Sequence, residues 1–131
     1  LSGVFPPVMT PFFKDGEIDY EGLAFNIEKM NQTDLGGYMP LGSNGEFRSL
    51  TDGEALEVIK LIAKNRAPGK TLMAGTGRES AYATIEFTKK AAQAGAEFAS
   101  VRLLERRGRA IRSKSSDLPM QILRAFRSRA G

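Results

Sequence analysis

Residues 36–77 read GGYMPLGSNGEFRSLTDGEALEVIKLIAKNRAPGKTLMAGTG. A short apolar run opens this stretch, a polar turn rich in glycine follows it, and a second apolar run closes it after Pro68 and Gly69. Between the runs, Thr51 precedes a segment whose apolar residues recur at helical spacing, and Glu54 stands three positions later, as in a capping box. The order of strand, helix and strand predicts a βαβ unit with two parallel strands.

The same order extends toward both ends of the chain. Strands are expected at 3–9 and 96–101, and helices at 20–33 and 80–95, with Asp19 and Ser80 as N-caps and Gly95 as a stop. Four strands alternating with three helices, at a repeat of about thirty residues, predict an α/β fold with a parallel sheet. A Rossmann-like sheet and a (β/α)8 barrel both begin in this way, and both bind ligands at the carboxyl ends of their strands.

Composition narrows the possible chemistry. The 131 residues are 41% apolar and contain neither cysteine nor histidine, which excludes disulfides, thiolate chemistry and histidine-based catalysis. A metal site is not expected, because the common zinc ligands are absent. No apolar run approaches the roughly 20 residues that cross a bilayer, and the N-terminus lacks the pattern of a signal peptide. We therefore expect a cytoplasmic protein that does not contact membranes.

Polar residues follow three of the expected strands: Thr10 the first, Gly42–Glu46 the second and Gly75–Glu79 the third. In the second, the Ser43 hydroxyl and nearby backbone amides could bind a carboxylate or a phosphate, or the residues could simply form a turn. The pattern of a P-loop is absent, and the third stretch lacks the last glycine of a dinucleotide fingerprint, so a tight turn is expected there.

Glu46 has two interpretations. It could act as a general acid or base, or it could be a structural carboxylate that accepts backbone hydrogen bonds from its own loop, and we favour the structural role. Tyr38 and Tyr82 are predicted to be packing residues rather than catalysts. The helical lysines, such as Lys60, Lys64 and Lys89, occupy surface-type positions that give no reason for a nucleophilic amine.

The succession GVFPPVMTPF, YMPLGSNGEFRSLT, ALEVI, LMAGTG and AGAEFASV resembles the pyruvate-dependent class I aldolases, the dihydrodipicolinate synthase and N-acetylneuraminate lyase family. The resemblance runs through residues 3–101. The usual Gly-Thr-Thr-Gly-Glu motif of that family stands here as Gly42-Ser43-Asn44-Gly45-Glu46, a variant similar to the 4-hydroxy-2-oxoglutarate aldolase branch.

The resemblance implies a (β/α)8 barrel, of which residues 1–101 would supply the first four βα units as a half-barrel. It implies that the family forms or cleaves a carbon–carbon bond next to a 2-oxo acid, through an imine on a lysine and with no metal or other cofactor. The turn would bind the carboxylate of a pyruvate-like 2-oxo acid, with Ser43 at the position that relays protons and Asn44 as a neighbouring contact. Thr10, Gly42 and Gly45 complete the expected binding set.

The Schiff-base lysine and the relay tyrosines of the family have no counterpart that we can place in this sequence. We therefore expect a truncated family member that is inactive alone. Because a barrel of this kind needs about 250 residues, a half-barrel would leave two sheet edges and its interior face uncovered. Self-association is the expected consequence.

Residues 102–131 differ sharply in composition from residues 1–101. They hold nine basic residues, of which eight are arginine, and two acidic residues. Residues 1–101 hold ten basic and thirteen acidic residues. Three hypotheses fit this tail: a basic arm for nucleic acid, an amphipathic helix over 118–129, and a frameshift near Val101. We favour the frameshift, because one choice of codons for 118–127 encodes a family-like segment in another frame. Nucleic acid is not an expected partner, since Phe126 is the only aromatic residue there, but a nucleic-acid-binding module is the alternative function.

Overall fold

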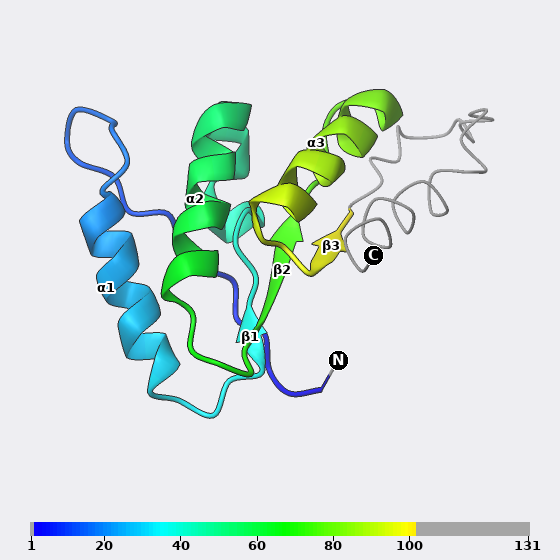
Figure 1. The fold of residues 1–131 in the computed structure, drawn as a ribbon. Helices are drawn as coiled ribbons and strands as arrows, with labels where there is room; N and C mark the ends of the chain where they lie inside the picture. The colour runs from blue at the N-terminus through cyan, green and yellow to red at the C-terminus, as the bar shows by residue number, and fades with distance from the viewer. Residues whose placement is uncertain (1, 102–131) are drawn as a thin grey trace.

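The structure is a computed structural model, and it describes residues 2–101 (Figure 1). The predictions made for 102–131 fall outside these residues. The elements follow in the order α1 (Tyr20–Asn31), β1 (Gly37–Tyr38), the 3-10 turns η1 (Ser43–Gly45) and η2 (Phe47–Ser49), α2 (Asp52–Asn65), β2 (Thr71–Gly75), α3 (Ala81–Ala94) and β3 (Phe98–Ser100).

The three strands form one parallel sheet in the order β1-β2-β3, which confirms the predicted α/β class. Tyr38 pairs with Leu72, and Met73 pairs with Phe98. The helices lie side by side in chain order along the sheet, with α2 packed against both of its neighbours (Figure 1). Alternate strand residues therefore meet the helices, and the core gathers on that side, from Leu23 and Ile27 of α1 through Ile59 and Ile62 of α2 to Phe87 and Ala91 of α3.

The stretch predicted as a strand at 3–9 is not a strand in the structure. It lies beside β1 through one parallel bridge between Pro7 and Met39. The Val8 N–H donates to the Met39 carbonyl at 3.1 Å, and the Met39 N–H donates to the Pro6 carbonyl at 3.1 Å. Pro6 faces β1 but has no N–H to donate, so the ladder is interrupted there. The described sheet consequently has three strands and not the expected four.

The predicted helix caps are confirmed. The Gly22 N–H donates to Asp19 at 2.8 Å, and the Ala83 N–H donates to the Ser80 hydroxyl at 3.1 Å. At Thr51 both halves of a capping box are present. Gly95 ends α3 with φ near 125°, a conformation that glycine adopts without a steric cost.

The two tyrosines predicted to pack behave differently. Tyr38 is fully buried, its hydroxyl is hydrogen-bonded to the Asn31 side chain, and burial raises its pKa above the ordinary value. Tyr82 lies in the first turn of α3 and is 76% exposed, so the packing prediction was wrong for this residue. Helical position alone does not determine which side of α3 faces the core.

Candidate functional site

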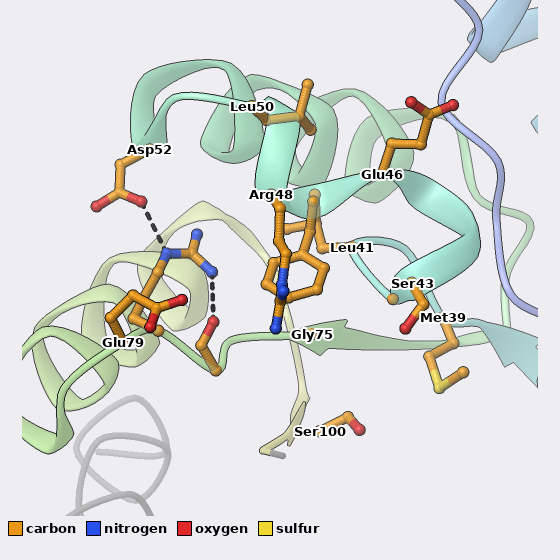
Figure 2. Close-up of a pocket in the computed structure, with 14 residues that line it drawn as sticks. Met39, Leu41, Ser43, Glu46, Arg48, Leu50, Asp52, Gly75, Glu79 and Ser100 are labelled. Atoms are coloured by element: carbon orange, nitrogen blue, oxygen red, sulfur yellow. Dashed lines mark hydrogen bonds and ion pairs between the residues drawn. The ribbon is translucent and has the colours of Figure 1, made fainter. Parts of the chain in front are cut away.

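A cavity of about 730 Å³ opens at the carboxyl ends of the strands (Figure 2). The turn after β1, the start of α2, the turn after β2 and the end of β3 all contribute to it. Its lining residues are Met39, Leu41, Gly42, Ser43, Glu46, Phe47, Arg48, Leu50, Asp52, Gly75, Gly77, Arg78, Glu79 and Ser100. The site thus occupies the edge of the sheet at which ligands bind in α/β proteins.

The turn after β1 has a strained backbone at both ends. Leu41 and Glu46 have φ values of 61° and 52°, in the left-handed region that residues other than glycine rarely adopt. Such residues cost on the order of 1–3 kcal/mol each, and they persist where surrounding contacts determine the conformation. Strain of this kind is concentrated at functional sites, which makes the Gly42–Gly45 turn the first candidate for binding.

Contacts from two other segments hold this turn in place. The buried Thr10 hydroxyl donates to the Gly45 carbonyl at 2.8 Å, and a Cβ on Gly45 would lie 2.9 Å from the Val8 carbonyl oxygen. On the other side, the Gly75 N–H donates to the Pro40 carbonyl at 2.9 Å. The strained backbone is therefore fixed both by the segment beside β1 and by the end of β2.

The structure separates the residues predicted to bind substrate into two groups. Gly42 and Ser43 line the cavity, whereas Thr10, Asn44 and Gly45 do not. Thr10 supports the turn through its hydrogen bond to the Gly45 carbonyl, and Asn44 is exposed.

Glu46, predicted to be structural, lines the cavity but is exposed. Its carboxylate points away from Ser43 and Arg48 in Figure 2 and accepts no hydrogen bond from residues 2–101. Its structural role stays a prediction.

The sequence analysis gave no binding role to three charged residues that line the cavity: Arg48, Asp52 and Arg78. Nε of Arg78 donates to Asp52 at 2.8 Å, one terminal nitrogen donates to the Gly77 carbonyl at 2.9 Å, and the guanidinium carbon lies 3.5 Å from the centre of the Phe87 ring. Asp52 and Arg78 are 26 positions apart, so no local spacing relates them. Arg48 forms no ion pair within residues 2–101.

The lining determines what chemistry the described part of the chain can perform. Hydroxyl and backbone N–H groups at Ser43, with positive charge at Arg48, suit a carboxylate. None of the lysines or tyrosines of residues 2–101 lines the cavity, so no amine nucleophile reaches it from these residues. The same residues contain no group of three or more acidic side chains placed to hold a metal ion, and no helix among them is long and apolar enough to cross a bilayer.

The sequence model of the dihydrodipicolinate synthetase family matches residues 1–101. The chain belongs to this family. A 4-hydroxy-tetrahydrodipicolinate synthase from Methanothrix thermoacetophila is 37% identical over 97 residues, which are 74% of this chain and 32% of that relative. The corresponding enzyme of Methanosarcina barkeri is 38% identical over 98 residues, or 74% and 33% of the two chains. This family member thus spans about a third of the length of the curated relatives it matches.

Solved structures similar to this chain include dihydrodipicolinate synthases and N-acetylneuraminate lyases. Dihydrodipicolinate synthase from Aquifex aeolicus superposes with a TM-score of 0.79 at 26% identity, over 95% of this chain and 42% of that one. N-acetylneuraminate lyase from Mycoplasma synoviae superposes with a TM-score of 0.79 at 27% identity, over 94% of this chain and 43% of that one. YagE of E. coli K12, solved in complex with pyruvate, superposes with a TM-score of 0.76 at 28% identity, over 98% of this chain and 42% of that one. The parallel sheet of this chain is accordingly that of a TIM-barrel family of aldolases and lyases.

Proposed function

We propose that the Gly42–Gly45 turn binds the carboxylate of a pyruvate-like 2-oxo acid. One observation carries the proposal: Ser43 lines the cavity at the end of β1, in a family with a member solved in complex with pyruvate. A Cβ built on Gly42 would meet no atom within 4 Å, so a ligand has room to approach the backbone there. The Ser43 hydroxyl and amide, which line the cavity, are the main donors for the carboxylate. The amide of the adjacent Asn44 would be a neighbouring contact, and Thr10 and Gly45 keep the turn in place.

The family reaction proposed for the whole enzyme is the making or breaking of a carbon–carbon bond beside the 2-oxo group. An imine between pyruvate and a lysine would carry it, with Ser43 relaying protons. Residues 2–101 bring no lysine to the cavity, so we assign to them the carboxylate-binding part and not the nucleophile. Residues 2–101 are then expected to bind pyruvate through its carboxylate without supplying the amine that reacts with it.

Two measurements on the full chain test this function. Titration of the 15N-labelled protein with pyruvate should shift the amide signals of Ser43 and Asn44. Treatment with pyruvate and borohydride should leave the intact mass unchanged, because no imine forms. An adduct on this chain would contradict the proposal, because one of its own lysines would then be the nucleophile.

A matched pair of serine variants locates the binding. Ser43→Ala should weaken pyruvate binding about fivefold or more, because a donor to a charged carboxylate is lost. Ser49→Ala should leave binding unchanged, since Ser49 is exposed and does not line the cavity. Equal affinities for the parent and Ser43→Ala would contradict the assignment of the turn.

A further inference from the structure

Arg78 is held more firmly than an arginine in a surface turn usually is. Its side chain is 15% exposed, although it lies in the turn between β2 and α3. The guanidinium stacks on the buried Phe87 ring of α3 at 3.5 Å, which is favourable both as apolar contact and as a cation–π interaction. The position of the charged group is therefore set by the core beneath it.

The guanidinium also joins two segments far apart in sequence. Nε donates to Asp52, the first residue of α2, and one terminal nitrogen donates back to the Gly77 carbonyl (Figure 2, dashed lines). Asp52 directly follows the capping residue Thr51, which in turn follows the loop of 42–50. Arg78 thus connects the end of that loop to the turn after β2.

The base of this connection is itself anchored. The Arg78 N–H donates to the Thr84 hydroxyl at 3.0 Å, and that hydroxyl donates to the Ser80 carbonyl at 2.9 Å. Deeper in α3, the Thr88 hydroxyl donates to the buried Thr76 hydroxyl at 2.9 Å. The turn after β2 is consequently fastened to α3 before the Arg78 side chain reaches across to α2.

The loop of 42–50 depends on such outside support. It consists of two 3-10 turns, contains the left-handed Glu46 and follows the left-handed Leu41. Thr10 holds it at Gly45, Gly75 holds the backbone just before it at the Pro40 carbonyl, and a third point of attachment, just after it, is Asp52. We propose that Arg78 is a positioning residue, which clamps the loop at Asp52 and so holds Ser43 and its amides in the geometry that binds a 2-oxo acid.

This inference rests on the proposed function and adds to it a residue that does not itself contact the carboxylate. Arginine is required because a planar guanidinium can stack on Phe87 while it donates to Asp52 and to the Gly77 carbonyl, whereas a lysine ammonium has donors but no plane that stacks on a ring. Asp52 is required as the charged acceptor. The guanidinium of Arg48, which forms no ion pair within residues 2–101, remains available to bind the carboxylate of a ligand.

The test compares Arg78→Lys and Asp52→Asn with a matched pair at the opposite end of the strands. Arg66 forms an ion pair with Glu97 there, and neither residue lines the cavity. Arg78→Lys and Asp52→Asn should each weaken pyruvate binding about tenfold in the NMR titration, with the double variant no weaker than either single one. Arg66→Lys and Glu97→Gln should bind pyruvate as the parent does.

Amide hydrogen exchange without ligand separates the clamp from the function. The Gly45 and Ser49 amides donate to Gly42 and Glu46 within the loop. They should exchange about tenfold faster in Arg78→Lys and Asp52→Asn, while the amides of α1 are unchanged. Unchanged loop exchange, or a lower melting temperature with unchanged pyruvate affinity, would overturn the proposal. If the parent does not bind pyruvate, the proposed function fails, and the exchange data alone decide whether Arg78 holds the loop.

Discussion

Gly75 determines how closely β2 approaches the Gly42–Gly45 turn. Its N–H donates to the Pro40 carbonyl, and a Cβ at this position would overlap the Leu41 carbonyl oxygen. Backbone is in contact with backbone there, so no flexible side chain can move aside. The left-handed Leu41 and the site that follows it therefore depend on the absence of a single methyl group.

Gly75→Ala is predicted to lower the free energy of unfolding by about 2 kcal/mol or more, since the overlap must be relieved by shifting backbone. Gly53→Ala is the matched control. Gly53 lies in the first turn of α2, and a Cβ added there would lie 3.9 Å from the Thr51 hydroxyl oxygen, an ordinary contact distance. That control should be neutral or stabilise by up to about 1 kcal/mol. Urea denaturation measures both, and a loss of stability in Gly53→Ala equal to that in Gly75→Ala would show that the close approach is unimportant.

Local chemistry explains which elements could be predicted from the sequence. The caps at Asp19, Thr51 and Ser80 were predicted because the residues that make them are three positions apart. The strand expected at 3–9 failed because two prolines remove the donors that a ladder needs. The Arg78–Asp52 contact was missed because its partners are 26 positions apart. The two 3-10 turns have local hydrogen bonds of their own, but Thr10, which supports them at Gly45, is distant in sequence. The sequence therefore predicted a polar turn that the structure places at the cavity, but not the contacts that support this turn.

The capping box of α2 should make part of the stability dependent on pH. Hydrogen bonds from the Thr51 hydroxyl and backbone lower the pKa of Glu54 below its ordinary value. The stabilisation is fully present above the ordinary glutamate pKa and is lost as the pH falls through the lowered one. The parent should therefore exceed Glu54→Gln in unfolding free energy near about pH 7, and the difference should shrink as the pH falls below the ordinary glutamate pKa of about 4.3. A difference that does not depend on pH would contradict this role.

At the scale of the whole molecule, the helices of residues 2–101 lie on one face of the sheet, and the other face carries apolar side chains. Met73 and Phe98 are paired neighbours on that second face, and Phe98 is 41% exposed. Met9, beside the bridge at Met39, is 69% exposed. In a closed barrel such side chains fill the interior. An apolar sheet face of this kind favours association in water.

Self-association of the 131-residue chain is the resulting prediction. Light scattering after size-exclusion chromatography should show a mass that rises with protein concentration. Phe98→Lys should shift the distribution toward monomer, because it places a charge on this apolar face. Phe25→Lys provides the control, since Phe25 is 57% exposed but lies on α1. A monomer at every concentration, or equal effects of the two variants, would contradict the role of this face.

The consecutive pairing of the elements has a consequence for how the chain acquires its structure. The segment beside β1, then β1, β2 and β3 join the sheet in the order in which they occur in the sequence, and each helix packs on the one before it. Every new strand adds to an edge that already exists, so no earlier contact must open to admit it. The chain can accordingly fold from its N-terminus during synthesis, one unit at a time as it emerges from the ribosome.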